Sequence, residues 1–327
     1  MKSFVAKRAV ITGGGTGMGR ELAVALAAEG ASVAMCDVST ETMAETQALC
    51  EKAAAAGAKI TTHLCDVADE RQVVAFRDAV ARDHGDGVEL LFNNAGIGGG
   101  DSFVAGDRSE WERTFGVCWG GVYLCTRAFL PLLVAAREAV IVNTSSVNGF
   151  WASLGPGIPH TAYSAAKFAV KGFSEALIED LRVNAPHVRV AVVMPGHIGT
   201  RIVANTRKVL GKPSYLEMGD RDVRRNRELL KARGVPVEQL TDDQIRTAMD
   251  QFASLFEQGA PLSAAGAAKA ILDGVRDGRW RILVGEDAKA IDELVRRDPD
   301  NAYERSFLKK IRDKGHFAGI SGDDPLG

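Results

Sequence analysis

Tyr163 and Lys167 are two polar side chains in an otherwise small and apolar stretch, TAYSAAKFAV, at residues 161–170. Residues four apart lie on the same face of a helix, so the phenol and the ammonium would point the same way. Burying either group without a partner costs free energy. The pair is therefore either a surface pair whose polar ends reach the solvent, or a device in which the two groups act together. Acting together, the ammonium would stabilise the phenolate and lower a pKa that is ordinarily about 10.

A second chemically specific stretch is the glycine-rich TGGGTGMG at residues 12–19, which follows an apolar run and opens a predicted helix. Glycines in such a loop let the backbone approach a pyrophosphate, and the free N–H groups of the helix N-terminus favour its charge. A Walker A loop is excluded because Arg20 and Glu21 stand where Lys and Ser or Thr are required. The alternative is a tight turn that merely tolerates glycine. The pattern T-G-x-x-x-G-x-G predicts a dinucleotide loop that uses Gly13, Thr16, Gly17, Met18 and Gly19.

Asp37 ends the next predicted strand, about 20 residues after the glycines, where an acid hydrogen-bonds the adenosine ribose of a dinucleotide. A carboxylate there would repel a 2′-phosphate, and neither Thr16 nor Val38 supplies a cation to bind one. The sequence therefore favours NAD over NADP as the cofactor. Considered alone, Asp37 could be a strand-end or helix-capping acid, and its position relative to the loop is what points to the ribose.

Short apolar runs alternate with alanine-rich helical stretches along most of the chain. Near-continuous apolar strands separated by helices predict a parallel sheet covered on both faces, which is a doubly wound α/β domain, or Rossmann fold. Ligands of such folds bind beyond the carboxyl ends of the strands. The predicted strands are 9–12, 32–37, 60–66, 89–96, 139–146, 188–196 and 281–285, and the predicted helices are 17–29, 41–56, 69–83, 110–135, 162–184 and 263–276.

Two segments break this alternation. Residues 201–261 are polar, and they end in a predicted helix with Thr241 and Gln244 as a capping box. That helix is expected to pack through one apolar stripe at positions 245, 248, 249, 252, 255 and 256. Residues 286–327 form a charged tail, expected to be helical and to end loosely. We therefore expect one domain, residues 1–285, with a helical insertion at 201–261, followed by the tail 286–327.

The composition excludes several classes of protein. The chain has 327 residues, 46% of them hydrophobic, and a net charge of −2, which argues against binding to nucleic acid or to a membrane surface. Its first apolar run is too short for a signal peptide or a spanning helix. Five cysteines without CxxC spacing indicate reduced thiols in the cytoplasm. The six histidines show no metal-binding pattern, so no metal is expected.

Taken in order, the motifs resemble those of the short-chain dehydrogenases/reductases. YxxxK alone is a weak signal, whereas the ordered set is specific. The resemblance spans residues 5–200, and the last helix and strand extend it to about 285. The matching stretches are TGGGTGMG at 12–19, CDV at 65–67, NNAG at 93–96, SS at 145–146, YSAAK at 163–167 and PGHIGT at 195–200.

The resemblance implies a role for each motif. Tyr163 would exchange a proton with the substrate, Lys167 would bind the nicotinamide ribose and help to lower the tyrosine pKa, and Ser146 would hydrogen-bond the substrate oxygen. It also implies a homodimer or homotetramer built on the helices at 110–135 and 162–184. It further implies that Asp66 and Val67 contact the adenine and that Asn93, Ala95 and Gly96 line the cofactor. Ile198 and Thr200 would contact the carboxamide, in a segment that begins with Pro195 and Gly196.

The chain departs from the family pattern at Cys118. The family has an asparagine there, on the helix after NNAG, and here the matching stretch reads FGVCWGGV. A thiol is a weak donor and acceptor, so it cannot organise a proton-relay water as an amide can. We interpret Cys118 as a buried helix thiol rather than a nucleophile, because no activating base adjoins it in the sequence.

The loop between Ser146 and Tyr163 is a few residues longer than is usual in the family. We expect Phe150, Trp151 and Leu154 of this loop to form an apolar wall of the substrate pocket, joined by His197 and covered by residues 201–261 acting as a lid. The alternative is a surface loop whose aromatic residues pack on a neighbouring subunit. The arginine-rich stretch 221–233 is expected to be a solvated helix face, with an arginine that binds an acidic substrate as the alternative.

These features together predict an NAD-dependent oxidoreductase that interconverts a secondary alcohol and a ketone, with an apolar or bulky small molecule as substrate. One alternative is a nucleotide-binding sensor or regulator that keeps the scaffold and has lost turnover, which Cys118 favours and the intact Ser146, Tyr163 and Lys167 oppose. Another is a different reaction on the same scaffold, such as dehydration or epimerisation.

Overall fold

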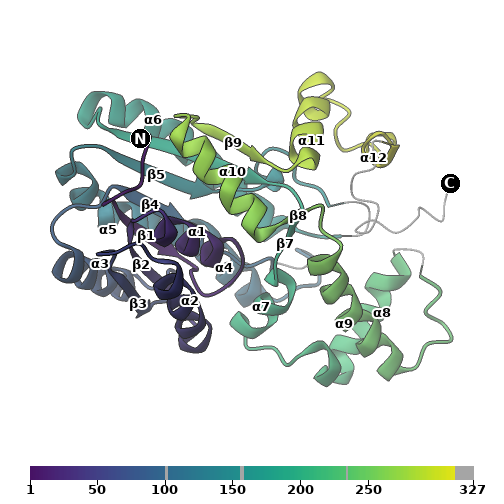
Figure 1. Cartoon of the computed structure of the whole chain (residues 1–327). Coiled ribbons are helices and arrows are strands. Elements are labelled where there is room, and N and C mark those ends of the chain that lie inside the picture. The colour runs from purple at the N-terminus through teal and green to yellow at the C-terminus, as the bar shows by residue number, and fades with distance from the viewer. Residues whose placement is uncertain (100–101, 155–157, 233–234, 314–327) are drawn as a thin grey trace.

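The computed structural model describes residues 1–99, 102–154, 158–232 and 235–313. A seven-stranded parallel sheet organises the chain, with the strand order β3-β2-β1-β4-β5-β6-β9 (Figure 1). The predicted doubly wound α/β fold in a single domain is therefore confirmed. The strands are β1 (Arg8–Thr12), β2 (Ser32–Asp37), β3 (Ile60–Leu64), β4 (Leu90–Asn93), β5 (Ala139–Thr144), β6 (Val188–Pro195) and β9 (Arg281–Val284).

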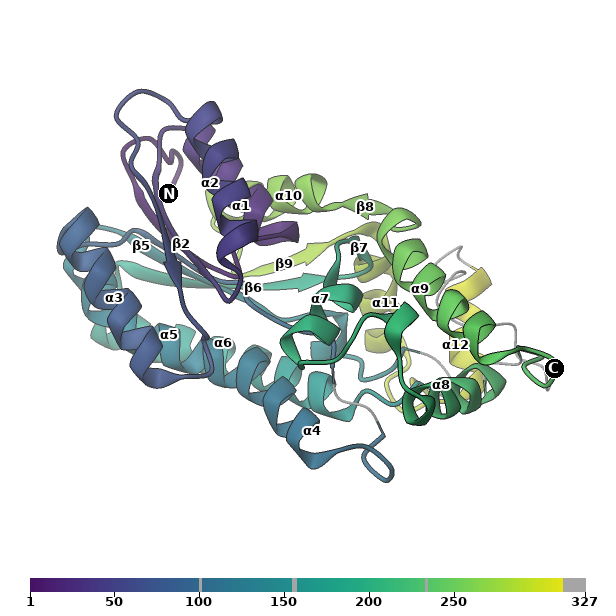
Figure 2. The same cartoon turned by 90° about the horizontal axis from the view of Figure 1, so that it is seen from below.

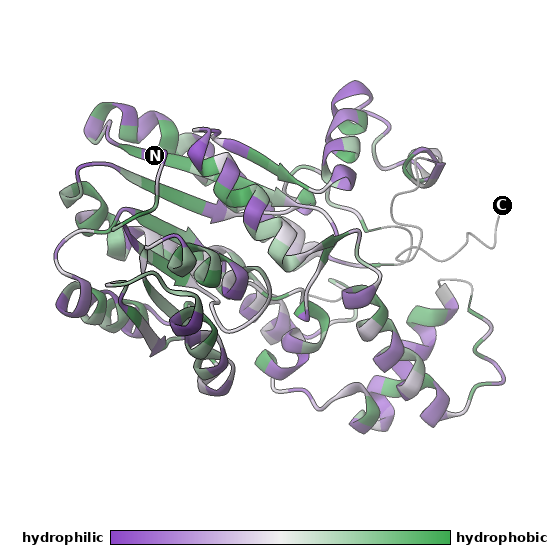
Figure 3. Cartoon of the chain, viewed as in Figure 1, coloured by the Kyte–Doolittle hydropathy of each residue, from purple (hydrophilic) through white to green (hydrophobic). Residues whose placement is uncertain are grey.

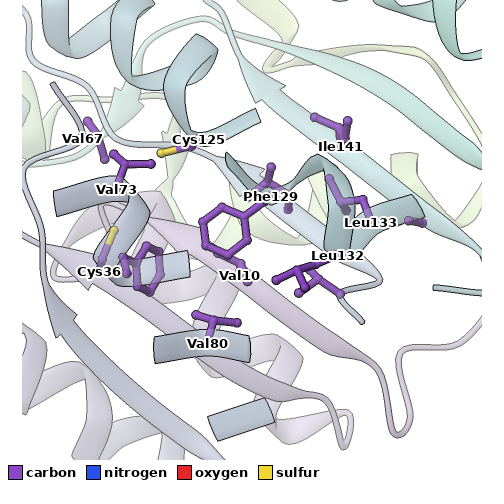
Figure 4. Close-up of a cluster of buried hydrophobic side chains, with 14 of the residues drawn as sticks. Val10, Cys36, Val67, Val73, Val80, Cys125, Phe129, Leu132, Leu133 and Ile141 are labelled. Atoms are coloured by element: carbon purple, nitrogen blue, oxygen red, sulfur yellow. The ribbon is translucent and has the colours of Figure 1, made fainter. Parts of the chain in front are cut away.

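Helices cover both faces of the sheet, as the continuous apolar strands predicted (Figure 2). Helices α1 (Gly17–Ala28), α2 (Thr40–Ala53) and α10 (Ala264–Arg276) lie on one face, and α3 (Glu70–His84), α5 (Gly121–Ala135) and α6 (Thr161–Asn184) lie on the other. Strand residues alternate between the two cores: Val10 and Ile141 face the α3/α5/α6 side (Figure 4), whereas Ile11 and Val140 face the α1/α10 side.

The parallel register brings the carboxyl ends of the central strands to one edge. Thr12 pairs with Cys36 across β1 and β2, and Asn93 pairs with Asn143 across β4 and β5. The loops that follow these strands therefore emerge side by side. The predicted strands 89–96 and 139–146 ran too long at this edge, because their last residues leave the sheet and turn towards the site.

The helix predicted at 110–135 is interrupted. It consists of α4 (Arg108–Phe115), one turn of π-helix (Gly116–Gly120) that contains Cys118, and α5. A π turn inserts an extra residue and often lies at a functional site. The stretch Arg108–Ala135 is long and apolar enough by composition to cross a membrane, but half of its most apolar window is buried within the protein, as in a core helix.

The lid segment, residues 201–261, folds as helices with a small core of their own. It contains α7 (Ile202–Val209), a 3₁₀ turn (Tyr215–Glu217), α8 (Asp220–Ala232) and α9 (Asp242–Gln258). Many residues of these helices are hydrophilic, as their purple colour in Figure 3 shows. The capping box of α9 is confirmed, since the Gln244 N–H donates to Thr241 Oγ1 at 3.3 Å and the Thr241 N–H donates to Gln244 Oε1 at 2.7 Å. The predicted stripe is buried at Ile245 and Met249, whereas Leu255 faces solvent.

The arginine-rich stretch belongs mostly to α8. Arg221 and Arg227 form ion pairs with Asp107 and Asp242, as expected of a solvated helix face. Arg225 differs, because it lines the cavity described below.

The charged tail is helical, as expected, and it packs on the rest of the protein as far as the structure describes it. Helices α11 (Glu286–Arg297) and α12 (Arg305–Asp313) bury apolar side chains against the loop that follows Ser146. That cluster joins Val147 and Trp151 to Ile291, Leu294 and Phe307. The loose end expected at SGDDPLG lies outside the described residues. A two-stranded parallel sheet, β7 (Ile198–Gly199) and β8 (Leu262–Ser263), closes the lid segment at its two ends.

Candidate active site

The glycine-rich loop has the backbone shape that a pyrophosphate requires. Gly13 and Gly17 have φ angles of +68° and +54°, in the left-handed region that favours glycine. A Cβ atom added at Gly19 would lie 2.0 Å from the Gly13 carbonyl oxygen. The loop and the N-terminus of α1 therefore face a cavity of about 500 Å³, whose lining includes Gly13, Thr16, Gly17 and Met18. Gly19 provides close packing and is not on the cavity wall.

Asp37 lies at the end of β2 on the same cavity wall. Its carboxylate accepts hydrogen bonds from the Gly15 N–H at 3.0 Å and the Val38 N–H at 2.7 Å. Asp66 and Val67 also line this cavity, and Asp66 is paired with Arg113 at 2.7 Å. The predicted adenosine end is thus assembled in one place from the loops after β1, β2 and β3.

The structure brings cations to this cavity that the sequence did not indicate. Arg113, Arg201 and Lys208 all line it. Arg113 is neutralised by Asp66, whereas Arg201 and Lys208 belong to the exposed side of the lid segment. These three residues lie far from Asp37 in the sequence, so the residues next to the glycine loop and Asp37 gave no sign of them.

NNAG contributes through a different asparagine from the one predicted. The Asn93 side chain is 2% exposed and donates to Thr126 Oγ1 at 2.9 Å and Asn143 Oδ1 at 2.8 Å, so it joins strands and helix within the core. Asn94 lies on the cavity wall instead, together with the predicted Ala95 and Gly96. The reason is that β4 ends at Asn93, whose side chain stays in the core, and Asn94 is the first residue after the strand.

A second cavity, of about 560 Å³, adjoins the first, and the two share Met18, Asn94, Gly96, Thr200 and Ile202. The three predicted catalytic residues meet on its wall: Ser146 after β5, and Tyr163 and Lys167 on α6. Pro195, Gly196, Ile198 and Thr200, expected at the carboxamide, line it as well. The continuous space therefore runs from the ribose end at Asp37 to the tyrosine.

Lys167 is a buried residue, which excludes the surface-pair interpretation. Its side chain is 3% exposed, its ammonium donates to the Thr144 carbonyl at 2.8 Å, and Nζ lies 5.4 Å from the centre of the Tyr163 ring. Burial lowers the pKa of Lys167, and the nearby Cys118 opposes that shift. The ammonium is thus directed along α6 towards the end of β5.

The acidity of Tyr163 differs from the expectation. Burial raises its pKa well above the ordinary range, Cys118 raises it further, and a hydrogen bond with Ser146 lowers it. The predicted lowering by Lys167 is not among these causes. Burial therefore opposes the phenolate form of Tyr163, and a positive charge near the ring would favour it.

His160 is a site residue that the sequence analysis missed. It lies one turn before Tyr163 on the same cavity wall, and the two ring centroids are 4.6 Å apart. Burial lowers the pKa of His160 to about 4, so the imidazole is neutral at physiological pH. His160 is the N-cap residue of α6, and its place three residues before Tyr163 was the available signal.

Cys118 is fully buried, as predicted, in the π turn. Its thiol donates to the Ile97 carbonyl at 3.2 Å and accepts from the Ile97 N–H at 3.4 Å. The side chain therefore ties the helix to the segment after NNAG.

No metal-binding group of three or more His, Cys, Asp or Glu side chains occurs in the described ranges of the chain.

The predicted aromatic wall is wrong for two of its members. Leu154 and His197 line the second cavity, the one beside Tyr163, which we call the substrate-side cavity, but Phe150 and Trp151 do not. Trp151 is 1% exposed, packs on Phe307 and donates its indole N–H to the Ala302 carbonyl at 2.7 Å. The long loop therefore turns its aromatic residues towards the tail rather than towards the substrate.

The lid segment supplies much of the remaining wall. Val203, Leu210, Phe252 and Phe256 contribute apolar surface. Arg207 and Asp222 contribute a charged pair, with their nearest nitrogen and oxygen 3.6 Å apart. Asn205 Nδ2 also donates to Thr16 Oγ1 at 2.9 Å, so α7 touches the glycine loop directly.

Comparison with known proteins agrees with this geometry. The family model for short chain dehydrogenase matches residues 7–210. SadH of Mycobacterium tuberculosis, whose name describes it as an oxidoreductase, is 37% identical over 297 residues, covering 90% of this chain and 92% of SadH.

Two solved structures of the family resemble this fold. A short-chain dehydrogenase/reductase from Burkholderia phymatum, in complex with NAD, aligns with a TM-score of 0.73 and 30% identity, covering 92% of this chain and 96% of that one. A metagenomic short-chain oxidoreductase in complex with NADP aligns with a TM-score of 0.53 and 31% identity, covering 59% of this chain and 84% of that one. The similar structures thus include both forms of the cofactor.

Proposed function

Because the chain belongs to the short-chain dehydrogenase/reductase family, whose members are NAD(P)-dependent oxidoreductases, we propose that it interconverts a secondary alcohol and a ketone with NAD. The observation that carries this proposal is the meeting of Ser146, Tyr163 and Lys167 on the wall of a cavity that continues into the glycine-loop cavity. A proton-exchanging group next to the nicotinamide end of a dinucleotide site is what carbonyl/alcohol chemistry requires.

The residues fit a dinucleotide. The glycine loop would bind the pyrophosphate through backbone N–H groups, and Asp37 would accept the ribose hydroxyls. Asp66 and Val67 would border the adenine, and Ile198 and Thr200 would hold the carboxamide end. When bound, the cofactor supplies a hydride acceptor and a positively charged ring.

The protein's part in the reaction is to orient the substrate and to move one proton. In oxidation, Ser146 would donate a hydrogen bond to the substrate oxygen while the Tyr163 oxygen takes the hydroxyl proton. The carbinol carbon loses its hydrogen as hydride at the same time, so a ketone is left. Lys167 would hydrogen-bond the nicotinamide ribose and favour the phenolate electrostatically. In reduction, Tyr163 gives the proton back.

NAD is the form of the cofactor that we propose. The Asp37 carboxylate lines the glycine-loop cavity, and it would repel a 2′-phosphate on an adenosine ribose bound there. Arg113 is already paired with Asp66 at 2.7 Å. Arg201 and Lys208 could serve a phosphate only by overcoming that repulsion.

The proposed substrate is an apolar or bulky small molecule. The cavity beside Tyr163 measures about 560 Å³, and apolar side chains from the Ser146 loop and the lid segment, including Leu154, Phe252 and Phe256, form part of its wall. We also propose that the chain acts in the cytoplasm as a homodimer or homotetramer built on α4/α5 and α6, where Tyr123 and Phe168 are exposed.

A sensor that binds the nucleotide without turning over is the second candidate, and Cys118 is the feature that favours it. The two candidates are separated by following NADH absorbance with wild-type protein, NAD and a panel of secondary alcohols of increasing size. Formation of NADH with at least one alcohol supports the oxidoreductase. Tight NAD binding without turnover of any alcohol, and without reduction of the matching ketones by NADH, supports the sensor.

A further inference from the structure

We propose that Asp287, in the C-terminal tail, is a positioning residue that fixes the loop at the nicotinamide end of the site and couples this loop to the lid segment. The inference rests on the proposed function in assigning that loop to the cofactor. It concerns a residue outside every motif that the sequence analysis identified.

Asp287 is a buried acid in an unusual position. It lies in the first turn of α11 and is 2% exposed. Its Oδ2 accepts a hydrogen bond from the His197 backbone N–H at 2.6 Å, across 90 positions of sequence. Within the described part of the chain, Oδ1 has no hydrogen-bond partner. Burying a carboxylate costs free energy, and the N-terminus of α11 offsets only part of that cost.

Two glycines make room for this carboxylate. A Cβ atom added at Gly196 would lie 2.2 Å from Asp287 Oδ2, and one added at Gly285 would lie 2.3 Å from Oδ1. Gly196 also donates its N–H to the Val284 carbonyl at 2.9 Å. The Gly196–His197 backbone is therefore held from two sides by the last strand and the tail helix.

His197 passes this constraint to the lid segment. Its Nε2 lies 2.7 Å from the Phe256 carbonyl oxygen of α9, and the two rings are 4.4 Å apart. Because a carbonyl only accepts, Nε2 carries the hydrogen. Both His197 and Phe256 line the substrate-side cavity. One residue thus joins the tail through its backbone and the lid through its side chain.

The tail also holds the loop that follows Ser146. Trp151 donates to Ala302, and the Ala152 N–H donates to the Tyr303 hydroxyl at 3.1 Å. The Trp151 carbonyl accepts from Asn148 Nδ2 at 3.0 Å, and the Asn148 N–H donates to Ser146 Oγ at 3.1 Å. The loop of Ser146 is therefore anchored on the segment between α11 and α12, the loop of His197 is anchored on α11, and both loops line the same cavity.

The test compares Asp287→Ala and Asp287→Asn with Asp292→Asn. Asp292 is a second largely buried acid on α11, but its carboxylate pairs with Arg281 at 3.0 Å instead of touching the loop. Two quantities are measured without any alcohol: the Kd for NADH by fluorescence, and amide hydrogen exchange of the peptides that cover 195–200 and 245–258. Unfolding midpoints report the stability of each variant.

Asp287→Ala is expected to raise the Kd for NADH about tenfold and to accelerate exchange in both peptides by a similar factor, the size expected for losing a hydrogen bond to a charged group. Asp287→Asn keeps an acceptor oxygen and should show a smaller change in the same direction. Asp292→Asn should leave both quantities within about twofold of wild type even where it lowers the midpoint.

An unchanged Kd and unchanged exchange in the Asp287 variants would overturn the proposal, as would equal effects from Asp292→Asn. If Asp287→Ala does not fold, Asp287→Asn against Asp292→Asn decides by the same two measurements. Neither the Kd for NADH nor the hydrogen exchange depends on turnover. Wild-type protein that binds NADH but oxidises no alcohol would therefore contradict the proposed function without contradicting the role of Asp287.

Discussion

The cofactor half and the substrate half of the site are built from different parts of the chain. The cofactor half consists of the ends of β1 to β4, where the sheet register brings Gly13, Asp37, Asp66 and Asn94 together. The substrate half is completed by the lid segment and supported by the tail, through contacts that span 59 to 151 positions of sequence, such as His197–Phe256 and Trp151–Ala302. The first half follows from the fold, whereas the second depends on additions to it.

This difference has a consequence for how each half responds to change. In the cofactor half, backbone groups would bind the proposed cofactor, so a side-chain substitution there should alter charge or cofactor preference more than shape. In the substrate half, side chains from separate segments support one another. We therefore expect substitutions there to disturb stability and substrate binding together.

The largest expected effect on stability is at Trp151. Trp151→Ala should lower the free energy of unfolding by about 3–5 kcal/mol, because it leaves a cavity against Phe307 and removes the hydrogen bond to Ala302. Urea denaturation measures the change. Trp280→Ala is the matched control, since Trp280 is 46% exposed and its loss should cost about 1 kcal/mol or less. Equal costs for the two variants would refute the packing role assigned to Trp151.

A smaller effect is expected from pH. The pKa of His160 is about 4 in the folded protein, below its ordinary value of 6.5. Between pH 6.5 and pH 4 the imidazole is therefore protonated in the unfolded chain and neutral in the folded one. Stability should therefore fall as the pH drops from 6.5 towards 4, with His160 contributing about 2 kcal/mol of that loss at pH 5. Urea unfolding at pH 7 and pH 5 measures it.

His84 gives the control for this prediction. Burial lowers its pKa to about 4 as well, but it lies at the far end of α3, away from both cavities. His160→Gln and His84→Gln should each reduce the acid-induced loss of stability. Only His160→Gln should change the KM for the alcohol. A change of KM with His84→Gln alone would contradict the assignment of His160 to the substrate wall.

In the cofactor half, the expected effect is on preference. Asp37→Asn keeps one acceptor oxygen, which can serve the Gly15 N–H or the Val38 N–H but not both, and it removes the charge that opposes a 2′-phosphate. The ratio of kcat/KM with NAD to that with NADP should fall about tenfold, which corresponds to about 1.4 kcal/mol. Asp66→Asn, on the same wall but paired with Arg113, should leave the ratio within about twofold. If Asp37→Asn leaves the NAD-to-NADP ratio unchanged, Asp37 does not bind the adenosine ribose.

The smallest effect is expected at Cys118. Asn is of similar size, and its amide can both donate to and accept from the Ile97 backbone as the thiol does. Cys118→Asn should therefore leave kcat similar, or raise it by up to about threefold if the thiol is a weakened proton relay. Steady-state rates with the same alcohol measure this. Complete loss of activity would mean that the thiol itself is needed.

The parts that could be predicted from the sequence are those set by short-range rules. The apolar strands, the glycine loop and the Thr241/Gln244 capping box depend on neighbours within a few residues, and each is found as expected. The spacing of Tyr163 and Lys167 on one helix is of the same kind.

The parts that could not be predicted depend on distant partners. The direction of the Trp151 side chain is decided by Ala302 and Phe307, and no local pattern relates them. The wrong asparagine of NNAG reflects where β4 ends, a boundary that propensity does not fix within one residue. The rise in the pKa of Tyr163 could not be predicted either, because burial outweighs the hydrogen bond from Ser146, and burial is a property of the assembled fold.

The most direct test of the central claim is Tyr163→Phe, which removes one oxygen and keeps the ring. With an alcohol that the wild-type protein oxidises, kcat should fall by about a thousandfold, within the range for losing a general acid/base. The Kd for NADH should stay within about twofold, because Lys167, Asp37 and the glycine loop are untouched. A variant that retains a tenth or more of the wild-type kcat would contradict the account.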